Sequence, residues 1–219
     1  MTDPAYEAVR RARNQEGSGN PPGAAETLER YLETDPHNTR ARMELARICA
    51  YPLGDLDRGN FQIDIVLDLE PGNVEALKAS ATIKAKERRR VAEAAGQFAR
   101  LIEVISPRGD PVEYSEVCAA YAVFLRRQMT DFPKAAEYYE KAIAASPSRY
   151  EFHQDYAVLL LNDLKDYVRA KRELEDAMRL NPGDKRTEEA YRRLLRQKFD
   201  SEGNLKRRSS VRLRRRGGP

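Results

Sequence analysis

The sequence has 219 residues, of which 41% are hydrophobic and 34% are charged, with 39 Lys and Arg against 35 Asp and Glu. No run approaches the roughly 20 apolar residues of a membrane-spanning helix, and residues 1–4 lack the pattern of a secretory signal, so we expect a cytoplasmic protein, or a nuclear one in a eukaryote. Two cysteines and two histidines supply neither a disulfide framework nor a four-ligand zinc site, and we expect no metal and no cofactor.

The N-terminal half carries a weak repeating pattern of small and apolar residues. Its first predicted break is the segment 17–23, where glycines and prolines indicate an inter-helix loop. A one-residue slip is needed to continue the pattern through residues 76–107. The positions that carry it before that slip are Ala24, Leu28, Tyr31 and Pro36, then Ala41, Leu45, Ala46, Ile63, Val66 and Pro71.

The same pattern is clear between residues 121 and 182, where it recurs after about 35 residues. Tyr121–Leu125 aligns with Tyr156–Leu160, and Pro147 aligns with Pro182. Apolar residues separated by one, three and four positions lie on one face of a helix, and each proline disfavours helix in the residue before it. Each unit therefore predicts two antiparallel helices joined by a short turn.

The C-terminal region is strongly basic. Residues 184–198 predict a last helix that buries Tyr191 and Leu195 and turns its arginines to water, as the end of a helical array requires. From residue 199 onward we expect a basic, disordered tail. Its residues predicted to bind a polyanion are Lys206, Arg207, Arg208, Arg212, Arg214, Arg215 and Arg216.

The clear units resemble the tetratricopeptide repeat, a helix-turn-helix of about 34 residues. The resemblance rests on small residues at Ala122, Ala135 and Ala142, on an aromatic at Tyr139 and on the closing prolines. Thr130 and Lys165 replace the family's usual glycine between the two helices, and Gly59 stands where the family prefers alanine. The resemblance implies an all-α solenoid of about five antiparallel hairpins with a capping helix over residues 1–198, followed by the tail, 199–219.

In that family the first helices of the hairpins line a concave groove that binds peptide segments of partner proteins. Basic residues of the second and third repeats and apolar centres of the fourth and fifth would suit an acidic or amphipathic peptide. The groove positions projected onto this sequence are Arg40, Met43, Arg47, Lys78, Lys86, Val123, Arg126, Gln154, Val158 and Asn162.

Residues that could carry catalysis are sparse. Segment 17–23 lacks the Lys-Ser/Thr of a phosphate-binding loop, and no zinc-protease, paired-cysteine or nucleophile-elbow motif occurs. Cys118 and His153 occupy equivalent places in adjacent repeats, and we interpret them as packing residues. A metal pair there would need further ligands, of which the spacing suggests only Glu188. The sequence therefore predicts no enzyme.

Three functional hypotheses remain. The first is a noncatalytic scaffold that binds a partner peptide in the groove. The second is a nucleic-acid-associated protein whose tail binds polyanions without sequence preference, anionic lipid being another candidate for the tail. The third is a helical domain of a larger complex with an enzymatic partner, which would expose a large apolar patch when isolated.

Overall fold

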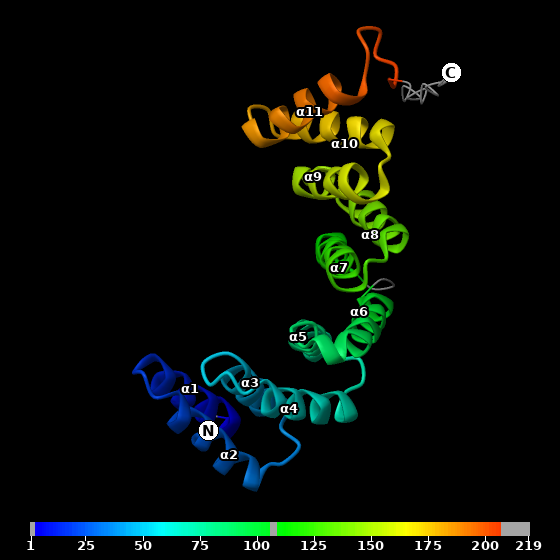
Figure 1. Cartoon of the computed structure of the whole chain (residues 1–219). Helices are drawn as coiled ribbons and strands as arrows, with labels where there is room; N and C mark the ends of the chain where they lie inside the picture. Colours follow the sequence, from blue (N-terminus) through cyan, green and yellow to red (C-terminus); the bar gives the residue numbers. More distant parts are fainter. Residues whose placement is uncertain (1–2, 106–108, 207–219) are drawn as a thin grey trace, which may run out of the picture. The chain divides into compact units, whose positions relative to one another are not determined.

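The computed structural model describes residues 3–105 and 109–206, which contain eleven α-helices and no named strand (Figure 1). The predicted all-α fold is confirmed. The chain divides into two compact units, residues 1–131 and 132–219. Within the described residues no helix is both long and apolar enough to cross a membrane.

The first unit contains three consecutive helical hairpins and the first helix of a fourth. Within each of the three hairpins the two helices pack most closely on each other, and contacts between neighbouring hairpins bury apolar faces that a lone hairpin would expose. The helices are α1 (Pro4–Gly17), α2 (Pro21–Thr34), α3 (Thr39–Ala50), α4 (Leu56–Leu69), α5 (Val74–Lys84), α6 (Val91–Ile105) and α7 (Pro111–Phe124), with a short 3₁₀ turn, η1 (Arg88–Arg90), before α6.

In its described residues the second unit contains four α-helices, the last of which is the predicted capping helix. It consists of α8 (Phe132–Ala145), α9 (Tyr150–Leu159), α10 (Tyr167–Leu180) and α11 (Lys185–Lys198). A π-helical turn extends α7 as η2 (Leu125–Met129), and a second one extends α9 as η3 (Leu160–Leu164). The five predicted helix pairs and the last helix are therefore all present in the described part of the chain.

Local sequence sets the helix ends. Four helices begin after a residue whose side chain accepts a hydrogen bond from a backbone N–H of the first turn: Asp3, Asn20, Asn38 and Asn73. These N–H groups have no acceptor within the helix, so the side chain supplies one. Proline occupies the first position of α2, where its missing N–H costs nothing. The loop predicted over 17–23 is thus too long: only residues 18–20 lie between α1 and α2.

Among the described residues, two turns adopt the left-handed conformation at a residue other than glycine. Thr130 has φ 53° and Lys165 has φ 58°, and they directly follow η2 and η3. The left-handed region suits glycine because it has no Cβ to clash with the next carbonyl. This conformation explains the glycine at the same place in the repeats that the sequence resembles.

The core runs along the inside of the hairpins and contains mostly small and aliphatic residues. Ala24, Ala94, Ala135 and Ala170 are completely buried at the start of α2, α6, α8 and α10. Gly59 occupies the corresponding place in α4, where a Cβ would lie 2.9 Å from Ala50 Cβ and 3.0 Å from the carbonyl oxygen of Ala46. The glycine therefore allows α3 and α4 to pack more closely than an alanine would.

The tail predicted to be disordered from residue 199 instead starts with a turn. Phe199 is buried and forms an isolated antiparallel bridge with Leu205. The Lys206 backbone N–H donates to the Lys198 carbonyl over 2.8 Å, which fixes the chain against the end of α11. The other predicted tail residues, 207–219, lie outside the described residues.

Candidate peptide-binding groove

A groove in the first unit follows α3, with α1 on one side and α5 on the other. It consists of two adjoining hollows that share Met43, Glu44 and Glu75. Arg40, Met43 and Arg47 line it from a single face of α3, because they are three and four residues apart. The structure therefore brings together three of the residues that the sequence projected onto the groove.

The end of the groove between α3 and α5 is mainly apolar. It is a cavity of about 110 Å³, lined by Met43, Ala46, Tyr51, Ala79 and Ile83 together with the shared glutamates and Arg47. The Tyr51 side chain is 50% exposed, and the Lys86 amino group lies 4.5 Å from the centre of its ring, within cation–π range. An apolar side chain of a ligand could be buried here.

Tyr51, Ala79 and Ile83 were not among the groove residues predicted from the sequence. A signal for Tyr51 exists, since Met43, Arg47 and Tyr51 follow one another at intervals of four residues. Pro52 follows Tyr51 directly and predicts the end of the helix, so Tyr51 was not assigned to the face that contains Met43 and Arg47. Ala79 and Ile83 continue the face that begins at Glu75.

The other end of the groove is a polar hollow of about 270 Å³ against α1. Its Glu44 carboxylate is only 6% exposed and accepts two hydrogen bonds from Arg13, at 3.0 and 2.9 Å, and one from Arg47 at 2.9 Å. Glu16 of α1 forms a further close ion pair with Arg47. The four side chains balance each other in charge and tie α1 to α3.

The electrostatics of this cluster follow from those contacts. Burial alone would raise the pKa of Glu44, but the hydrogen bonds from Arg13 and Arg47 outweigh it and lower the pKa. The hydrogen bond to Glu16 is the main cause that raises the pKa of Arg47. Arg47 is therefore committed to internal partners, and the groove has less free positive charge than the sequence suggests.

Two other predicted cations also have partners in the first unit. Lys78 forms a close ion pair with Glu113 of α7 and is not among the residues that line the apolar cavity. Arg40 is exposed, and its guanidinium lies 5.4 Å from the centre of the Tyr6 ring. Of the arginines in the groove, Arg40 has no ion pair with any described residue.

The remaining predicted groove residues are divided between the units. Val123 on α7 and Arg126 on η2 are half-buried in the first unit. In the second unit, Val158 is 38% exposed on α9. Asn162 of η3 lines a hollow of about 340 Å³ with basic residues of α11 and of the turn between η3 and α10. The side-chain amide of Gln154 donates a hydrogen bond to Asp184 Oδ2 over 2.6 Å, and so it contacts the residue that precedes α11.

Cys118 and His153 are both buried, in agreement with their interpretation as packing residues. His153 Nδ1 lies 2.8 Å from Glu173 Oε2, and Nε2 lies 3.3 Å from the Pro147 carbonyl oxygen. Because both ring nitrogens face oxygen acceptors, protonated imidazole matches this site best. The hydrogen bond with Glu173 is the main cause that raises the pKa of His153.

His153 and Glu173 also belong to a group of possible metal ligands among the described residues. One ligand atom each from His153, Glu173 and Asp176 lie within 4.8 Å of one another. His153 Nδ1 already makes the hydrogen bond with Glu173. The partner suggested by the spacing, Glu188, instead accepts a hydrogen bond from Arg192 over 2.8 Å.

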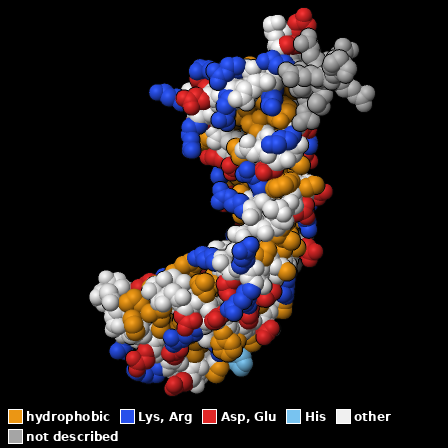
Figure 2. All heavy atoms as spheres, in the orientation of Figure 1, with side chains coloured by type: hydrophobic (Ala, Val, Ile, Leu, Met, Phe, Trp, Pro, Cys, Tyr) orange, Lys and Arg blue, Asp and Glu red, His pale blue; other side chains and the backbone are white. Residues whose placement is uncertain are grey.

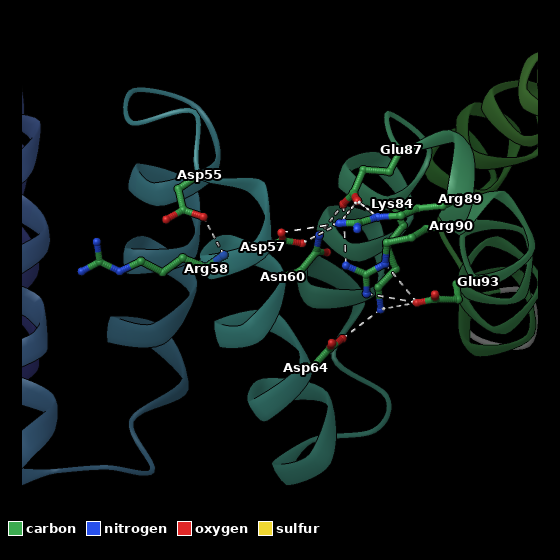
Figure 3. A network of polar contacts seen from close by, with 10 residues as sticks. All are labelled: Asp55, Asp57, Arg58, Asn60, Asp64, Lys84, Glu87, Arg89, Arg90 and Glu93. Atoms are coloured by element: carbon green, nitrogen blue, oxygen red, sulfur yellow. Dashed lines mark hydrogen bonds and ion pairs between the residues drawn. The ribbon is translucent and has the colours of Figure 1, made fainter.

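The basic segment 84–90 is part of an internal network rather than a freely solvated turn (Figure 3). Lys84 is 4% exposed, and its amino group donates to Asp64 Oδ1 over 2.9 Å. Arg89 and Arg90 both form ion pairs with Glu87. The contact between Lys84 and Asp64 joins the end of α5 to α4, and the ion pairs together engage three of the five basic side chains of the segment.

Comparison with known proteins agrees with this architecture of stacked helical hairpins. The family model of the tetratricopeptide repeat matches residues 9–59 and 125–185, about half of the chain, and the chain belongs to that family. Proteins of this family are, in general, scaffolds that bind partner proteins or peptides. No curated protein matches the sequence.

Solved structures resemble the chain in fold over most of its length. A tetratricopeptide repeat protein from Parabacteroides merdae superposes with a TM-score of 0.69 at 16% identity, covering 87% of this chain and 72% of that one. MamA from Desulfovibrio magneticus gives 0.67 at 17%, covering 84% and 99%. PilF of Pseudomonas aeruginosa gives 0.64 at 20%, covering 88% and 83%. At these identities the likeness shows the fold alone.

Proposed function

We propose that this protein is a noncatalytic cytoplasmic adaptor that binds an amphipathic segment of a partner protein in the groove along α3. An apolar side chain of the segment enters the cavity between α3 and α5, while its polar groups lie over the hollow beside α1. The observation that carries the proposal is the continuity of the two hollows through Met43, Glu44 and Glu75.

The charges of the groove define the ligand further. Arg40 is the arginine there without a described ion pair, and it is available to a carboxylate of the segment. Glu75 is exposed on the opposite wall and is available to a cation. A segment with an acidic residue on one side of its apolar anchor and a basic residue on the other would satisfy both walls.

The test selects ligands from a displayed library of random peptides on the full chain and measures their affinity by calorimetry. Ala79→Arg places a long side chain in the apolar cavity, whereas Ala92→Arg adds the same charge at an exposed position of α6 and serves as the matched control. We expect Ala79→Arg to lower affinity at least about tenfold, which corresponds to about 1.4 kcal/mol, and Ala92→Arg to leave it unchanged.

Two results would refute the proposal. Peptides that bind both variants as tightly as the original chain would place the ligand elsewhere. A selection that enriches no peptide with an apolar residue next to charged ones would remove the reason for assigning the cavity to an anchor. Circular dichroism of both variants establishes that the helices are intact.

A further inference from the structure

The exposed face of α11 carries a row of arginines. Arg186, Arg192, Arg193 and Arg196 line a hollow of about 500 Å³, where Glu189 is the acidic residue among the lining side chains. All four arginines are exposed. Figure 2 shows Lys and Arg side chains gathered over this end of the second unit.

Most of this positive charge has no internal partner. Arg192 binds Glu188 over 2.8 Å, but Arg186, Arg193 and Arg196 form no ion pair with any described residue. We call these three residues the arginine ridge. Elsewhere in the structure, arginines such as Arg13 form ion pairs with acidic side chains.

A capping role for α11 does not explain the ridge. The outer face of a last helix must be polar, but acidic or neutral residues would serve as well as arginines. Adjacent unpaired arginines repel one another, and residues 207–219 add six more arginines without any Asp or Glu. A face with this much uncompensated charge is expected to bind a polyanion.

The composition of the face distinguishes among polyanions. Helices that bind membranes insert large apolar side chains beside their basic ones, yet Leu194 of α11 is buried and no large apolar side chain is exposed on this helix. Arginine clusters also bind acidic peptides, but on this face such a peptide would gain no contact with a large exposed apolar side chain. A nucleic-acid backbone needs no such contact, because its phosphates bind through charge and hydrogen bonds alone.

The spacing of the ridge suits a row of phosphates. From Arg186 to Arg196 the helix rises about 15 Å, and duplex DNA carries one charge for about every 1.7 Å of its axis, so each guanidinium can reach a different phosphate. Arginine binds phosphate through two parallel hydrogen bonds, which lysine cannot form. Tyr191, the aromatic residue of α11, is half-buried and donates its hydroxyl to Glu175 over 2.7 Å.

We propose that the arginine ridge of α11 binds the sugar-phosphate backbone of nucleic acid without reading its sequence. This surface belongs to the folded second unit and is separate from the groove along α3. The contacts are to phosphates because the exposed face offers no aromatic ring on which a base could stack. The ridge can act together with the arginines of residues 207–219 or without them.

The test measures binding of the full chain to a short DNA duplex of mixed sequence by fluorescence anisotropy over a series of salt concentrations. In the ridge variant, Arg186, Arg193 and Arg196 are each replaced by Gln. The control variant carries Arg11→Gln, Arg88→Gln and Arg100→Gln, which removes the same charge from exposed positions of the first unit that have no ion pair with a described residue. A tail variant replaces Arg214, Arg215 and Arg216 by Gln.

If each ridge arginine neutralises one phosphate, the slope of log K against log salt becomes less steep by about 2.7 in the ridge variant, since each contact contributes about 0.9. We expect the control variant to keep the original slope. Equal losses in the ridge and control variants would show that net charge alone attracts the duplex. Loss in the tail variant with none in the ridge variant would move the site to residues 207–219, and either outcome overturns the proposal.

A second probe separates nucleic acid from a membrane. Vesicles with and without phosphatidylserine are tested with the same four proteins. Ridge-dependent binding to anionic vesicles that exceeds binding to the duplex would assign the ridge to a lipid surface. Absence of duplex binding by the original chain at low salt would exclude the nucleic-acid interface altogether. Circular dichroism and thermal unfolding of each variant establish that the exposed substitutions leave the helices folded.

Discussion

Gly59→Ala is the substitution at which repeat consensus and tertiary structure lead to opposite expectations. The corresponding positions in other repeats, such as Ala24 and Ala94, hold alanine. Alanine also stabilises the interior of a helix by about 1 kcal/mol relative to glycine. A comparison of repeats alone would therefore rank Gly59→Ala among the stabilising changes.

The structure predicts the reverse. The new Cβ would lie 2.9 Å from Ala50 Cβ, whereas two carbon atoms in contact are normally about 3.5–4.0 Å apart. It would also lie 3.0 Å from the Ala46 carbonyl oxygen. Neither neighbour is the end of a flexible side chain, so α3 and α4 must separate. Overpacking of this kind costs about 1–3 kcal/mol, and after the gain in helix propensity we expect a net loss of about 1 kcal/mol.

Gly96→Ala is the matched control for this prediction. Gly96 lies inside α6, and a Cβ there would meet nothing within 4 Å. We expect this variant to gain about 0.5–1 kcal/mol, so that the two alanines shift the free energy of unfolding in opposite directions. Urea unfolding followed by circular dichroism measures both, and in a thermal scan 1 kcal/mol corresponds to about 2–4 °C. Equal stabilisation by both substitutions would refute the close approach of α3 and α4.

Three further predictions concern charge and backbone strain. Arg47→Glu should lower the free energy of unfolding in urea by about 3 kcal/mol, because it places a second negative charge beside the buried Glu44. Lys78→Glu breaks a partly exposed ion pair and should lower it by about 1 kcal/mol or less. Equal losses in the two variants would contradict the different burial of the two pairs. The raised pKa of His153 contributes stability that is fully present below its unfolded value of 6.5 and is lost as the pH rises through the folded pKa. The free energy of unfolding measured across this pH range should therefore fall, and in His153→Gln this pH dependence should be absent. Thr130→Gly should stabilise the protein by about 0.5–1 kcal/mol, because glycine adopts the left-handed φ of 53° without strain. A lower midpoint of thermal unfolding in this variant would show that the threonine is not strained.

The prediction for Arg47 also decides how the groove should be tested. A charge reversal there removes internal hydrogen bonds of Glu44, so lost ligand binding would be confounded with a weakened fold. Ala79→Arg avoids the difficulty, because Ala79 lines the cavity without a polar contact to lose. A substitution at the apolar end therefore reports on the ligand.

The sequence by itself determined the helix pairs and their order. Tyr121 and Tyr156 lie in corresponding helices because apolar residues at intervals of three and four define a face locally. Asn20 and Asn73 start helices through hydrogen bonds that span only a few residues. Local signals of this kind need no knowledge of the tertiary arrangement. They failed where Pro21 was taken for part of a loop, although proline is also well suited to begin a helix.

Only the tertiary structure decided which charges are available to a partner. Arg47 and Glu16 are 31 positions apart, and they meet because α1 and α3 pack side by side. The exposed Arg186 looks no different in the sequence from Arg47, which is committed to internal partners. A cation's availability depends on the acids that neighbouring helices bring within reach, and this is a property of packing that no interval along the chain specifies.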